Sequence, residues 1–323
     1  MNTRPPGLIA QVVSIATCLF ALWPGIAVHA QPGRGLKIVD SHDVKVRGGV
    51  LQVDFAEGPL DQPQVILKHI EAAASAVVAY YGQLPVKKAR VLIVPVPGRR
   101  GVVQGTTWGD MAGFPGMTRL RVGEHTTPED LRDDWTTTHE LVHLAFPTLP
   151  DDQHWMEEGL ATYIEPLARV MTGELTARRV WHDMARDMHQ GEAGAGDQGL
   201  DRTHTWGRTY WGGALFCLVA DVAIRRQTHN HKGLRDALRA IVEHGGTIDQ
   251  NWDLPKALAI GDTATGTHVL TRQYADWKDK PVTVDLPGLW AQLGVRLEGD
   301  DISLTPNAPL SHIRDAIAGE HLH

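Results

Sequence analysis

The sequence has almost no cysteine: its 323 residues include only Cys18 and Cys217. Cys18 lies in an N-terminal segment that we expect to be removed, and one remaining cysteine cannot form a disulfide bond within the chain. Cys217 belongs to an apolar helical stretch, residues 214–219, where a thiol is more typical of a core than of a nucleophile. The fold must therefore depend on burial, and 42% apolar and 21% charged residues are sufficient for a globular core.

Blocks of like charge are absent too. The formal net charge is −7, and acidic and basic residues are interspersed without a Lys/Arg-rich block or an internal repeat. Proteins that bind nucleic acid usually carry a basic patch or stripe, so we expect no nucleic-acid partner.

Long hydrophobic runs are confined to the N-terminus. Residues 8–23 form an apolar stretch that is shorter than the ~20 residues needed to span a bilayer. Arg4 precedes this stretch, a Pro-Gly pair ends it, and residues 28–30 place small side chains before Gln31. This order predicts a signal peptide over residues 1–30 rather than an uncleaved anchor. We therefore expect a secreted or periplasmic protein with no stable membrane span after cleavage.

The part that follows has a mixed pattern. Apolar–polar alternation around a Gly48-Gly49 turn predicts strands, and apolar residues at helical spacing predict a helix. The expected elements are strands within 36–60, a helix over 63–81, and strands at 90–96 and 117–122. They favour an N-terminal α/β sheet region over residues 31–125.

Helical periodicity dominates the remainder. Thr127 is a suitable N-cap with Pro128 and Asp130 in the first turn, so we expect a helix from there to Pro147. Further helices are expected at 152–170, 209–226 and 234–243, a glycine-rich loop at 191–199, and short helices near 287–293 and 310–318. The sequence thus predicts an α+β fold, in which the sheet region precedes a helical region over 126–245 and a C-terminal helical region over 246–323.

A His-Glu-x-x-His motif, residues 139–143, lies on the first of these helices. Positions i and i+4 of a helix share a face, so His139 and His143 can bind one tetrahedral zinc ion. Glu140 is rotated away from the two ligands. Its carboxylate can act as general base on a water whose pKa the metal lowers from about 15.7 towards ~7.

A third ligand is needed, because a catalytic zinc usually has three protein ligands and one open position. The next helix contains Trp155-Met156-Glu157-Glu158-Gly159, and a glutamate there can reach the metal after the short turn that follows Pro147. Spacing alone leaves Glu157 and Glu158 both open.

The two motifs together resemble the gluzincin metallopeptidases. His-Glu-Leu-Val-His followed by Trp-x-x-Glu-Gly-x-Ala-x-Tyr (residues 155–163) is similar to the aminopeptidase N and glycyl aminopeptidase-like families. In those families the Glu before the Gly binds zinc, which implies Glu158 as the third ligand and Glu157 as its neighbour. The resemblance covers about residues 127–245. It implies a thermolysin-like catalytic domain with one catalytic Zn²⁺ and a peptide or protein substrate.

Two further residues enter with this resemblance. Residues 209–215, Thr-Tyr-Trp-Gly-Gly-Ala-Leu, are similar to a segment of the same families whose Tyr hydroxyl donates to the oxyanion, which implies that role for Tyr210. Glu165 lies seven residues beyond Glu158 on the same helical face, where it can accept the free ring N–H of a zinc-bound histidine. An ordinary exposed helix acid is the alternative interpretation of Glu165.

One departure concerns specificity. Aminopeptidase N-type enzymes carry a Gly-x-Met-Glu-Asn strand whose Glu binds the substrate amine, and residues 105–113 contain no Glu-Asn pair. Asp110 is the candidate replacement, and Thr107 to Asp110 can line the site. Aminopeptidase specificity is therefore not supported, and internal cleavage stays open. We interpret His154, like most other histidines, as a surface group.

The leading hypothesis is a secreted zinc metallopeptidase with Glu140 as general base and Tyr210 as oxyanion stabiliser. One alternative is hydrolysis of a non-peptide amide, because zinc and a glutamate can act on any carbonyl. The other is a catalytically silent gluzincin-fold protein that binds or assembles. The silent alternative is disfavoured because the base and a full set of ligands are present.

Overall fold

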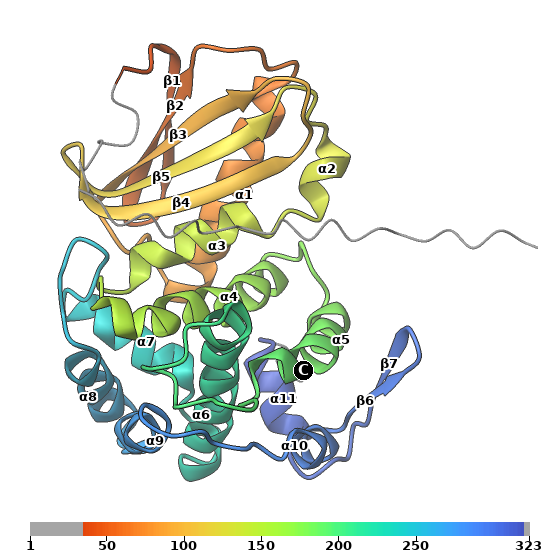
Figure 1. The fold of residues 1–323 in the computed structure, drawn as a ribbon. Helices are drawn as coiled ribbons and strands as arrows, with labels where there is room; N and C mark the ends of the chain where they lie inside the picture. Colours follow the sequence, from red (N-terminus) through yellow and green to blue (C-terminus); the bar gives the residue numbers. More distant parts are fainter. Residues whose placement is uncertain (1–34, 320–323) are drawn as a thin grey trace, which may run out of the picture. The chain divides into compact units, whose positions relative to one another are not determined.

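The computed structural model describes residues 35–319, so the signal peptide predicted at 1–30 lies outside the described residues. A five-stranded sheet comes first and a mainly helical part follows, drawn in red to yellow and in green to blue in Figure 1. The predicted α+β class is confirmed. Along the described chain, no helix combines the length and the apolar character needed to cross a membrane.

The sheet has the strand order β1-β2-β3-β5-β4. Its strands are β1 (Ile38–Val46), β2 (Gly49–Ala56), β3 (Lys88–Val96), β4 (Val102–Met111) and β5 (Phe114–Gly123). β1 and β2 form a hairpin whose turn places Gly48 at φ 95°, a conformation that glycine adopts without steric cost. β2, β3 and β5 run parallel, whereas β4 is antiparallel to β5 and lies at one edge. This edge strand contacts the helix that carries the His-Glu-x-x-His motif.

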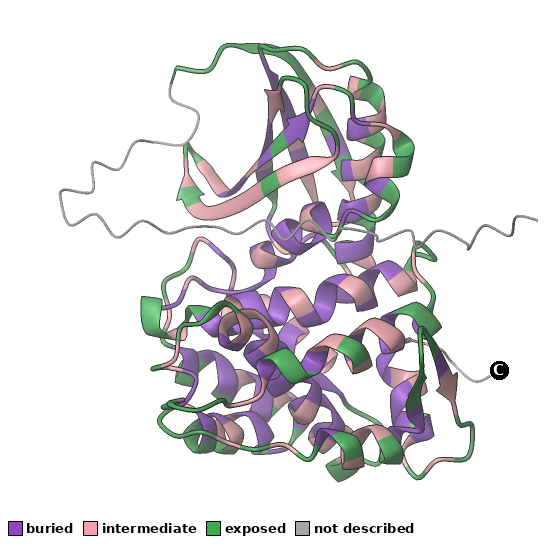
Figure 2. Ribbon diagram, turned by 45° about the vertical axis from the view of Figure 1, so that its right-hand side comes forward, coloured by how far each residue is buried: buried purple, intermediate pink, exposed green. Residues whose placement is uncertain are grey.

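Helix α1 (Pro63–Tyr81) connects β2 to β3, and its bounds match the predicted helix. Proline in the first turn favours its start, and Gly82 at φ 88° ends it in the left-handed conformation. The buried α1 residues Ile70 and Val77 belong to the same hydrophobic core as Leu51 of the sheet and the helices that follow. Figure 2 shows buried residues in purple both on the strands and on the helices of the second part. Sheet and helices therefore stabilise each other through one core.

The second part contains ten α-helices among the described residues. Their bounds are α2 (Pro128–Arg132), α3 (Thr136–Val142), α4 (His154–Met171), α5 (Ala177–Asp187), α6 (Gly213–Gln227), α7 (Leu234–Glu243), α8 (Leu254–Thr265), α9 (Val269–Trp277), α10 (Leu286–Leu293) and α11 (Ser311–Ile317). α7 matches its predicted bounds, and α4 and α6 begin a few residues later than predicted. Helix α5 has no counterpart in the sequence prediction. The hairpin of β6 (Val295–Glu298) and β7 (Asp301–Leu304) is not predicted either. It interrupts the C-terminal region that the sequence predicts as helical.

The single helix predicted over residues 127–147 is wrong, because the chain breaks at 133–135 into α2 and α3. The predicted capping box is present at the start of α2. Asp134 explains the break: its carboxylate accepts hydrogen bonds from the backbone N–H groups of Thr136 and Thr137. A side chain that satisfies the unpaired N–H groups of a first turn favours a new helix start. The motif helix α3 therefore has its own N-terminal anchor.

His69 of α1 completes this anchor. Its Nε2 lies 2.8 Å from Asp134 Oδ2, and both side chains are largely buried. Burial alone would raise the pKa of Asp134, but the contact with His69 and the hydrogen bonds from Thr137 lower it below its ordinary value. The ionised carboxylate thus ties α1 to the start of α3.

Replacing Asp134 by Ala is expected to lower the free energy of unfolding by ~2–4 kcal/mol, because a helix cap and buried hydrogen bonds are lost together. The pKa of Asp134 is depressed in the folded protein, so its contribution is present above the ordinary value of 3.8 and is lost as the pH falls through the lower folded pKa. Urea denaturation at pH 7 and pH 3 measures both effects. The exposed neighbour Asp133, replaced by Ala, is the matched control. Equal losses in the two variants would contradict the anchor.

Two glycines allow α4 to approach the segment that carries Tyr210. A Cβ atom at Gly159 would collide with the backbone of Gly213, and one at Gly213 would collide with the backbone of Trp155 and Gly159. Helices that approach this closely need residues without side chains at the contact. The two glycines thus place the α4 turn that carries Glu158 beside residues 208–213.

Candidate metal centre

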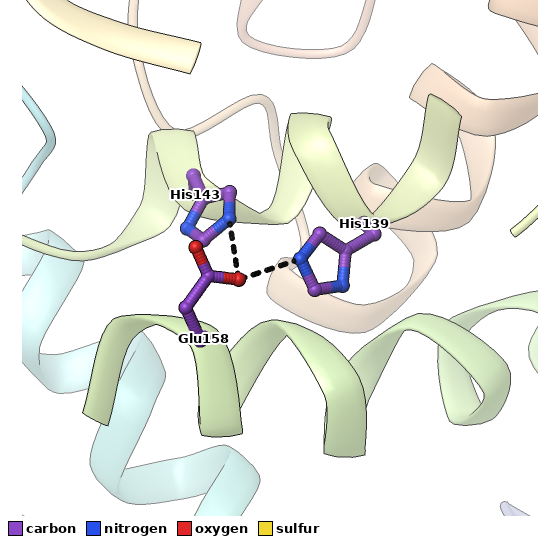
Figure 3. Close-up of side chains that lie close together, drawn as sticks. All are labelled: His139, His143 and Glu158. Atoms are coloured by element: carbon purple, nitrogen blue, oxygen red, sulfur yellow. Dashed lines mark hydrogen bonds and ion pairs between the residues drawn. The ribbon is translucent and has the colours of Figure 1, made fainter. Parts of the chain in front are cut away.

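Three side chains from α3, the turn after it and α4 converge, as Figure 3 shows. His139 lies in α3, His143 begins the 3₁₀ turn His143–Ala145, and Glu158 lies near the start of α4. The Nε2 atoms of His139 and His143 are 3.0 Å and 3.7 Å from Glu158 Oε2. One ligand atom of each residue lies within 4.8 Å of the other two. The structure thus brings together the three residues that the sequence predicts as ligands.

This donor set fits zinc. Two imidazole nitrogens and one carboxylate oxygen are a ligand set that catalytic zinc sites use. The side chains are nearly closed off from solvent, with exposed fractions of 4% for His139, 14% for His143 and 11% for Glu158. Buried polar groups need partners, and a cation among these three atoms would satisfy all of them together.

Electrostatics at the site favour an ionised glutamate. Burial alone would raise the pKa of Glu158, but the charge of His143 and the contacts with His139 and His154 hold it well below its usual range. For His139 burial acts to lower the pKa, and the hydrogen bond and charge of Glu158 raise it overall. The arrangement is a carboxylate facing two imidazoles, which is suited to a cation.

Glu157 and His154 lie next to each other, and His154 contacts Glu158, the predicted third ligand. Glu157 Oε1 accepts from the backbone N–H of Leu149 at 3.2 Å, and Glu157 Oε2 lies 2.8 Å from His154 Nδ1. His154 Nε2 lies 3.2 Å from Glu158 Oε1, whereas the distances to His139 and His143 are those of Oε2. Hydrogen bonds to both glutamates raise the pKa of His154 to about 10.

These contacts distinguish the surroundings of the two glutamates and revise the interpretation of His154. Glu157 is already engaged away from the ligand cluster, so Glu158 alone faces the two motif histidines. His154 is 53% exposed, as expected for a surface group, but it also holds Glu158. The signal for this contact is present in the sequence as the i, i+3 and i, i+4 spacing of His154 to the glutamates.

Glu140 lies beside the ligands, between α3 and the edge strand β4. Thr107 Oγ1 of β4 donates to Glu140 Oε2 at 2.7 Å and also lies 3.0 Å from the Glu140 backbone oxygen. A Cβ atom at Gly105 would collide with the Glu140 side chain, so this strand position needs glycine. The sequence predicts Thr107 among the residues that can line the site, and in the structure it contacts Glu140, the predicted general base.

If Glu140 is the general base, replacing Thr107 by Val is expected to lower kcat by about tenfold, because Glu140 loses the hydrogen bond that orients its carboxylate. Zinc content should not change, since Thr107 contacts none of the three ligands in the hydrogen bonds of the described chain. Thr107→Ser, which keeps the hydroxyl, should restore most of the rate. A Ser variant as slow as the Val variant would show that packing, rather than the hydrogen bond, is responsible.

Glu165 is buried, and its hydrogen bond runs to Arg169 rather than to a histidine. Arg169 Nη1 donates to Glu165 Oε1 at 2.9 Å. Burial raises the pKa of Glu165 to about 7, against the opposing charges of Arg169 and His139. His139 Nδ1 is buried and has no hydrogen-bond partner in the described chain. The predicted hydrogen bond between Glu165 and a zinc-ligand imidazole is therefore not formed in this structure.

Tyr210 lies on a π-helical turn, Arg208–Gly212, just before α6. Single π turns within helices frequently occur at functional sites. The Tyr210 ring is stacked on His139 with ring centroids 6.1 Å apart. The structure thus brings the predicted oxyanion stabiliser next to the first predicted ligand.

A buried ion pair fixes this turn to the glycine-rich loop. Arg208 Nε lies 2.7 Å from Asp197 Oδ2, with exposed fractions of 5% and 2% for the two side chains. Arg208 Nη1 also donates to the backbone oxygen of Gly191. The loop at 191–199 is therefore attached to the segment that carries Tyr210.

Asp110, the candidate amine ligand, is exposed near the end of β4. Its backbone has φ 46°, and it adjoins the turn at Ala112 and Gly113 that leads into β5. Gly109, which precedes it, packs against the backbone of Ile248. The residue therefore belongs to the hairpin end of the strand, beyond the part at Thr107 that contacts Glu140.

Comparison with known proteins gives a likeness in structure but none in sequence. No protein-family model matches the chain, and no curated protein matches it. An aminopeptidase N family protein from Idiomarina loihiensis superimposes with a TM-score of 0.58 and 14% identity, over 80% of this chain and 50% of that one. An M1 zinc metallopeptidase from Deinococcus radiodurans, a Glu-to-Ala mutant bound to a Tyr-Ser-Ala substrate, superimposes with a TM-score of 0.51 and 18% identity. The match covers 78% of this chain and 54% of that one.

The fold is thus that of the aminopeptidase N family and other M1 zinc metallopeptidases, which confirms the resemblance predicted from the two motifs. The chain spans about half the length of these structures. At identities of 14% and 18% the likeness concerns the fold. Chemistry has to be argued from the site, because one fold can host different functions.

Proposed function

We propose that this protein is a zinc-dependent metallopeptidase with a thermolysin-like catalytic unit that hydrolyses peptide bonds. The observation that carries the proposal is the convergence of His139, His143 and Glu158, with Glu140 held beside them by Thr107 of β4. A metal site of three ligands with an adjacent, independently held carboxylate is the arrangement that metal-assisted hydrolysis needs. The fold shared with M1 zinc metallopeptidases supports the same reaction class.

Each residue has a separate role in this proposal. Zinc held by the three ligands would polarise the scissile carbonyl and make a water more acidic. Glu140 accepts a proton from the attacking water and passes it to the leaving amine, because its carboxylate is not a ligand and is oriented by Thr107. Tyr210, stacked on His139, supplies a hydroxyl that donates to the negative charge developing on the carbonyl oxygen.

Replacing Tyr210 by Phe is expected to lower kcat by ~10²–10³-fold, because one donor to the oxyanion is lost. KM and zinc content should change little, since the ring and its stacking on His139 are retained. Tyr274→Phe is the matched control, because that hydroxyl donates to Asp201 at 2.7 Å instead. If the two variants lose activity equally, Tyr210 acts through packing and not through its hydroxyl.

We also propose that the protein acts outside the cytoplasm, secreted or periplasmic, on the basis of residues 1–30. N-terminal sequencing of the protein recovered from the culture medium or periplasm of its host should give a chain that begins at Gln31. Recovery of only the uncleaved chain from the cytosol would contradict this.

The test of the proposed reaction is incubation of the zinc-loaded protein with a diverse peptide library, analysed by mass spectrometry. We expect cleavage that stops when zinc is chelated and returns when zinc is added back. The cut positions distinguish removal of N-terminal residues from internal cleavage. A folded, zinc-bound protein that cleaves no peptide in the library would refute the proposal and favour a binding function or a non-peptide amide.

A further inference from the structure

We propose that Trp135 and Trp206, named here the tryptophan pair, bind large apolar or aromatic side chains of the peptide substrate close to the scissile bond. This inference rests on the proposed function, because it assigns the substrate class of the same site. It concerns recognition, and the residues act by contact with substrate side chains.

The tryptophan pair is unusual in its exposure. Trp135 is 52% and Trp206 is 61% exposed, and among residues 35–319 the other large apolar side chains at the surface are Leu36, Ile38, Val39 and Leu297. An exposed tryptophan presents a large apolar area to water, and such residues commonly mark places where a ligand or partner binds.

Both members of the pair contact proposed catalytic groups. The Trp135 ring meets the His139 ring edge-on, with centroids 5.1 Å apart. The Trp206 ring is stacked on Tyr210 at 5.7 Å, and Tyr210 is stacked on His139 at 6.1 Å. The four rings therefore form a continuous series in which the two exposed tryptophans are the ends and the proposed metal ligand and oxyanion stabiliser are the middle.

The local chain explains this placement. Trp135 comes one helical turn before His139, directly after the Asp134 anchor that starts α3. Trp206 comes one turn before Tyr210, and the intervening Arg208 is fixed by its buried pair with Asp197. Each tryptophan is thus carried by a segment that contacts a buried carboxylate. Asp134 holds the backbone after Trp135, and Asp197 pairs with the side chain of Arg208 two residues after Trp206.

The position of these four rings indicates which molecule the tryptophan pair binds. A molecule that covers either tryptophan comes within ring contact of a residue that acts on the scissile bond, so the occupant is the chain being cleaved. Side chains on one face of an extended peptide recur every ~6.6 Å, which is similar to the ring-to-ring steps. Each tryptophan can therefore take one side chain within about two residues of the cut.

Aromatic surfaces select by area and by ring geometry. Phe, Tyr, Trp and Leu side chains bury apolar area against an indole, and aromatic ones add the preference of rings for stacked or edge-on contact. A Ser or Glu side chain gains neither and loses hydration. The protein should therefore prefer large apolar side chains over small polar or acidic ones by about tenfold or more.

The test compares the zinc-loaded protein with Trp135→Ala and Trp206→Ala on the same peptide library. We expect enrichment of Phe, Tyr, Trp and Leu at defined positions within two residues of the cuts, and loss of that enrichment by about tenfold at a different position in each variant. Trp135→Phe and Trp206→Phe should keep most of the preference. Leu297→Ala, which removes an exposed apolar side chain from β6, is the matched control and should change nothing.

A purely structural role is separated by the pattern of the loss. If either tryptophan merely supports His139 or Tyr210, all peptides are cleaved more slowly by the same factor and the enrichment is unchanged. That result, or the absence of any enrichment in the unmodified protein, overturns the inference.

A binding measurement distinguishes this inference from the proposed function. Calorimetric titration of the zinc-loaded Glu140→Gln variant uses Gly/Ala hexapeptides that contain one Phe, Leu or Ser. Tighter binding of the Phe and Leu peptides by about tenfold, lost in combination with Trp135→Ala or Trp206→Ala, supports recognition even if the protein cleaves nothing. Equal affinity for the Phe and Ser peptides refutes recognition even if cleavage is observed.

Discussion

Replacing Glu158 by Gln is expected to lower the affinity of the protein for zinc by more than ~100-fold. The Glu158 carboxylate is buried, faces the Nε2 atoms of His139 and His143, and is the one anionic group of the ligand cluster. An amide of the same size keeps the volume but removes the charge that attracts the cation. Competition with a chromophoric chelator measures the affinity, and metal analysis after dialysis should give close to one zinc per wild-type chain and almost none in the variant.

Thermal unfolding provides an independent readout of the same change. A ligand that binds only the folded state stabilises it, by ~2.7 kcal/mol when its concentration is 100 times Kd. Added zinc should therefore raise the melting temperature of the wild type, and the same zinc concentration should leave Glu158→Gln nearly unaffected.

Glu157 offers a matched control at the next residue. Glu157→Gln removes the same charge from the same turn of α4, but that carboxylate contacts the Leu149 backbone and His154 instead of the motif histidines. We expect a smaller loss of zinc affinity, up to about tenfold, through the contact of His154 with Glu158. Loss of zinc in the Glu157 variant with retention in the Glu158 variant would mean that the ligand has been assigned to the wrong glutamate.

Replacing Glu140 by Gln is expected to lower kcat by ~10²–10⁴-fold while the protein keeps its zinc. Glutamine has nearly the shape of glutamate, and its side-chain oxygen can still accept the hydrogen bond from Thr107 Oγ1. It cannot accept a proton at neutral pH, so the attacking water loses its base. Initial rates on a peptide found in the library screen, together with metal analysis, measure the two quantities.

Comparison of Glu158→Gln with Glu140→Gln separates the effect on zinc binding from the effect on catalysis. Glu158→Gln should lose zinc and activity together, whereas Glu140→Gln should lose activity alone. If Glu140→Gln retains more than about a tenth of the wild-type rate, another group is the base and the proposed mechanism fails. If Glu140→Gln loses zinc, its lower kcat results from a disturbed metal site. The role of Glu140 is then tested with Thr107→Val instead.

Much of the fold could be predicted because its signals are local. The bounds of α1 follow from a proline in the first turn, helical spacing of apolar residues and a terminal glycine. The β1–β2 hairpin follows from alternation around Gly48. The break between α2 and α3 could not be predicted from periodicity, because it depends on Asp134 and its burial against His69. Helix α5 has no counterpart among the predicted elements, and the β6–β7 hairpin lies in a region predicted as helical.

In the candidate site, too, local sequence signals predict some of the contacts and leave others open. The four-residue spacing of His139 and His143 predicts a shared face on any helix, so sequence alone placed these two residues together and set Glu140 aside from them. That a glutamate of the next helix approaches them follows from the short connection. The choice of Glu158 over Glu157 rested on a family resemblance, because spacing left both open.

Tertiary structure decided what surrounds the motif. Adjacent residues of a helix point in directions about 100° apart, so the packing of α4 on α3 turns Glu158 to the histidines and Glu157 to Leu149. The antiparallel edge strand β4 lies against α3 and places Thr107 next to Glu140. Glu165 is buried, and its carboxylate accepts a hydrogen bond from Arg169. Sequence thus determined which groups can bind and activate, because their chemistry and helical spacing are local. Only the fold determined which groups of distant segments hold them, as Thr107 of β4 holds Glu140, because such contacts join residues that are far apart in the chain.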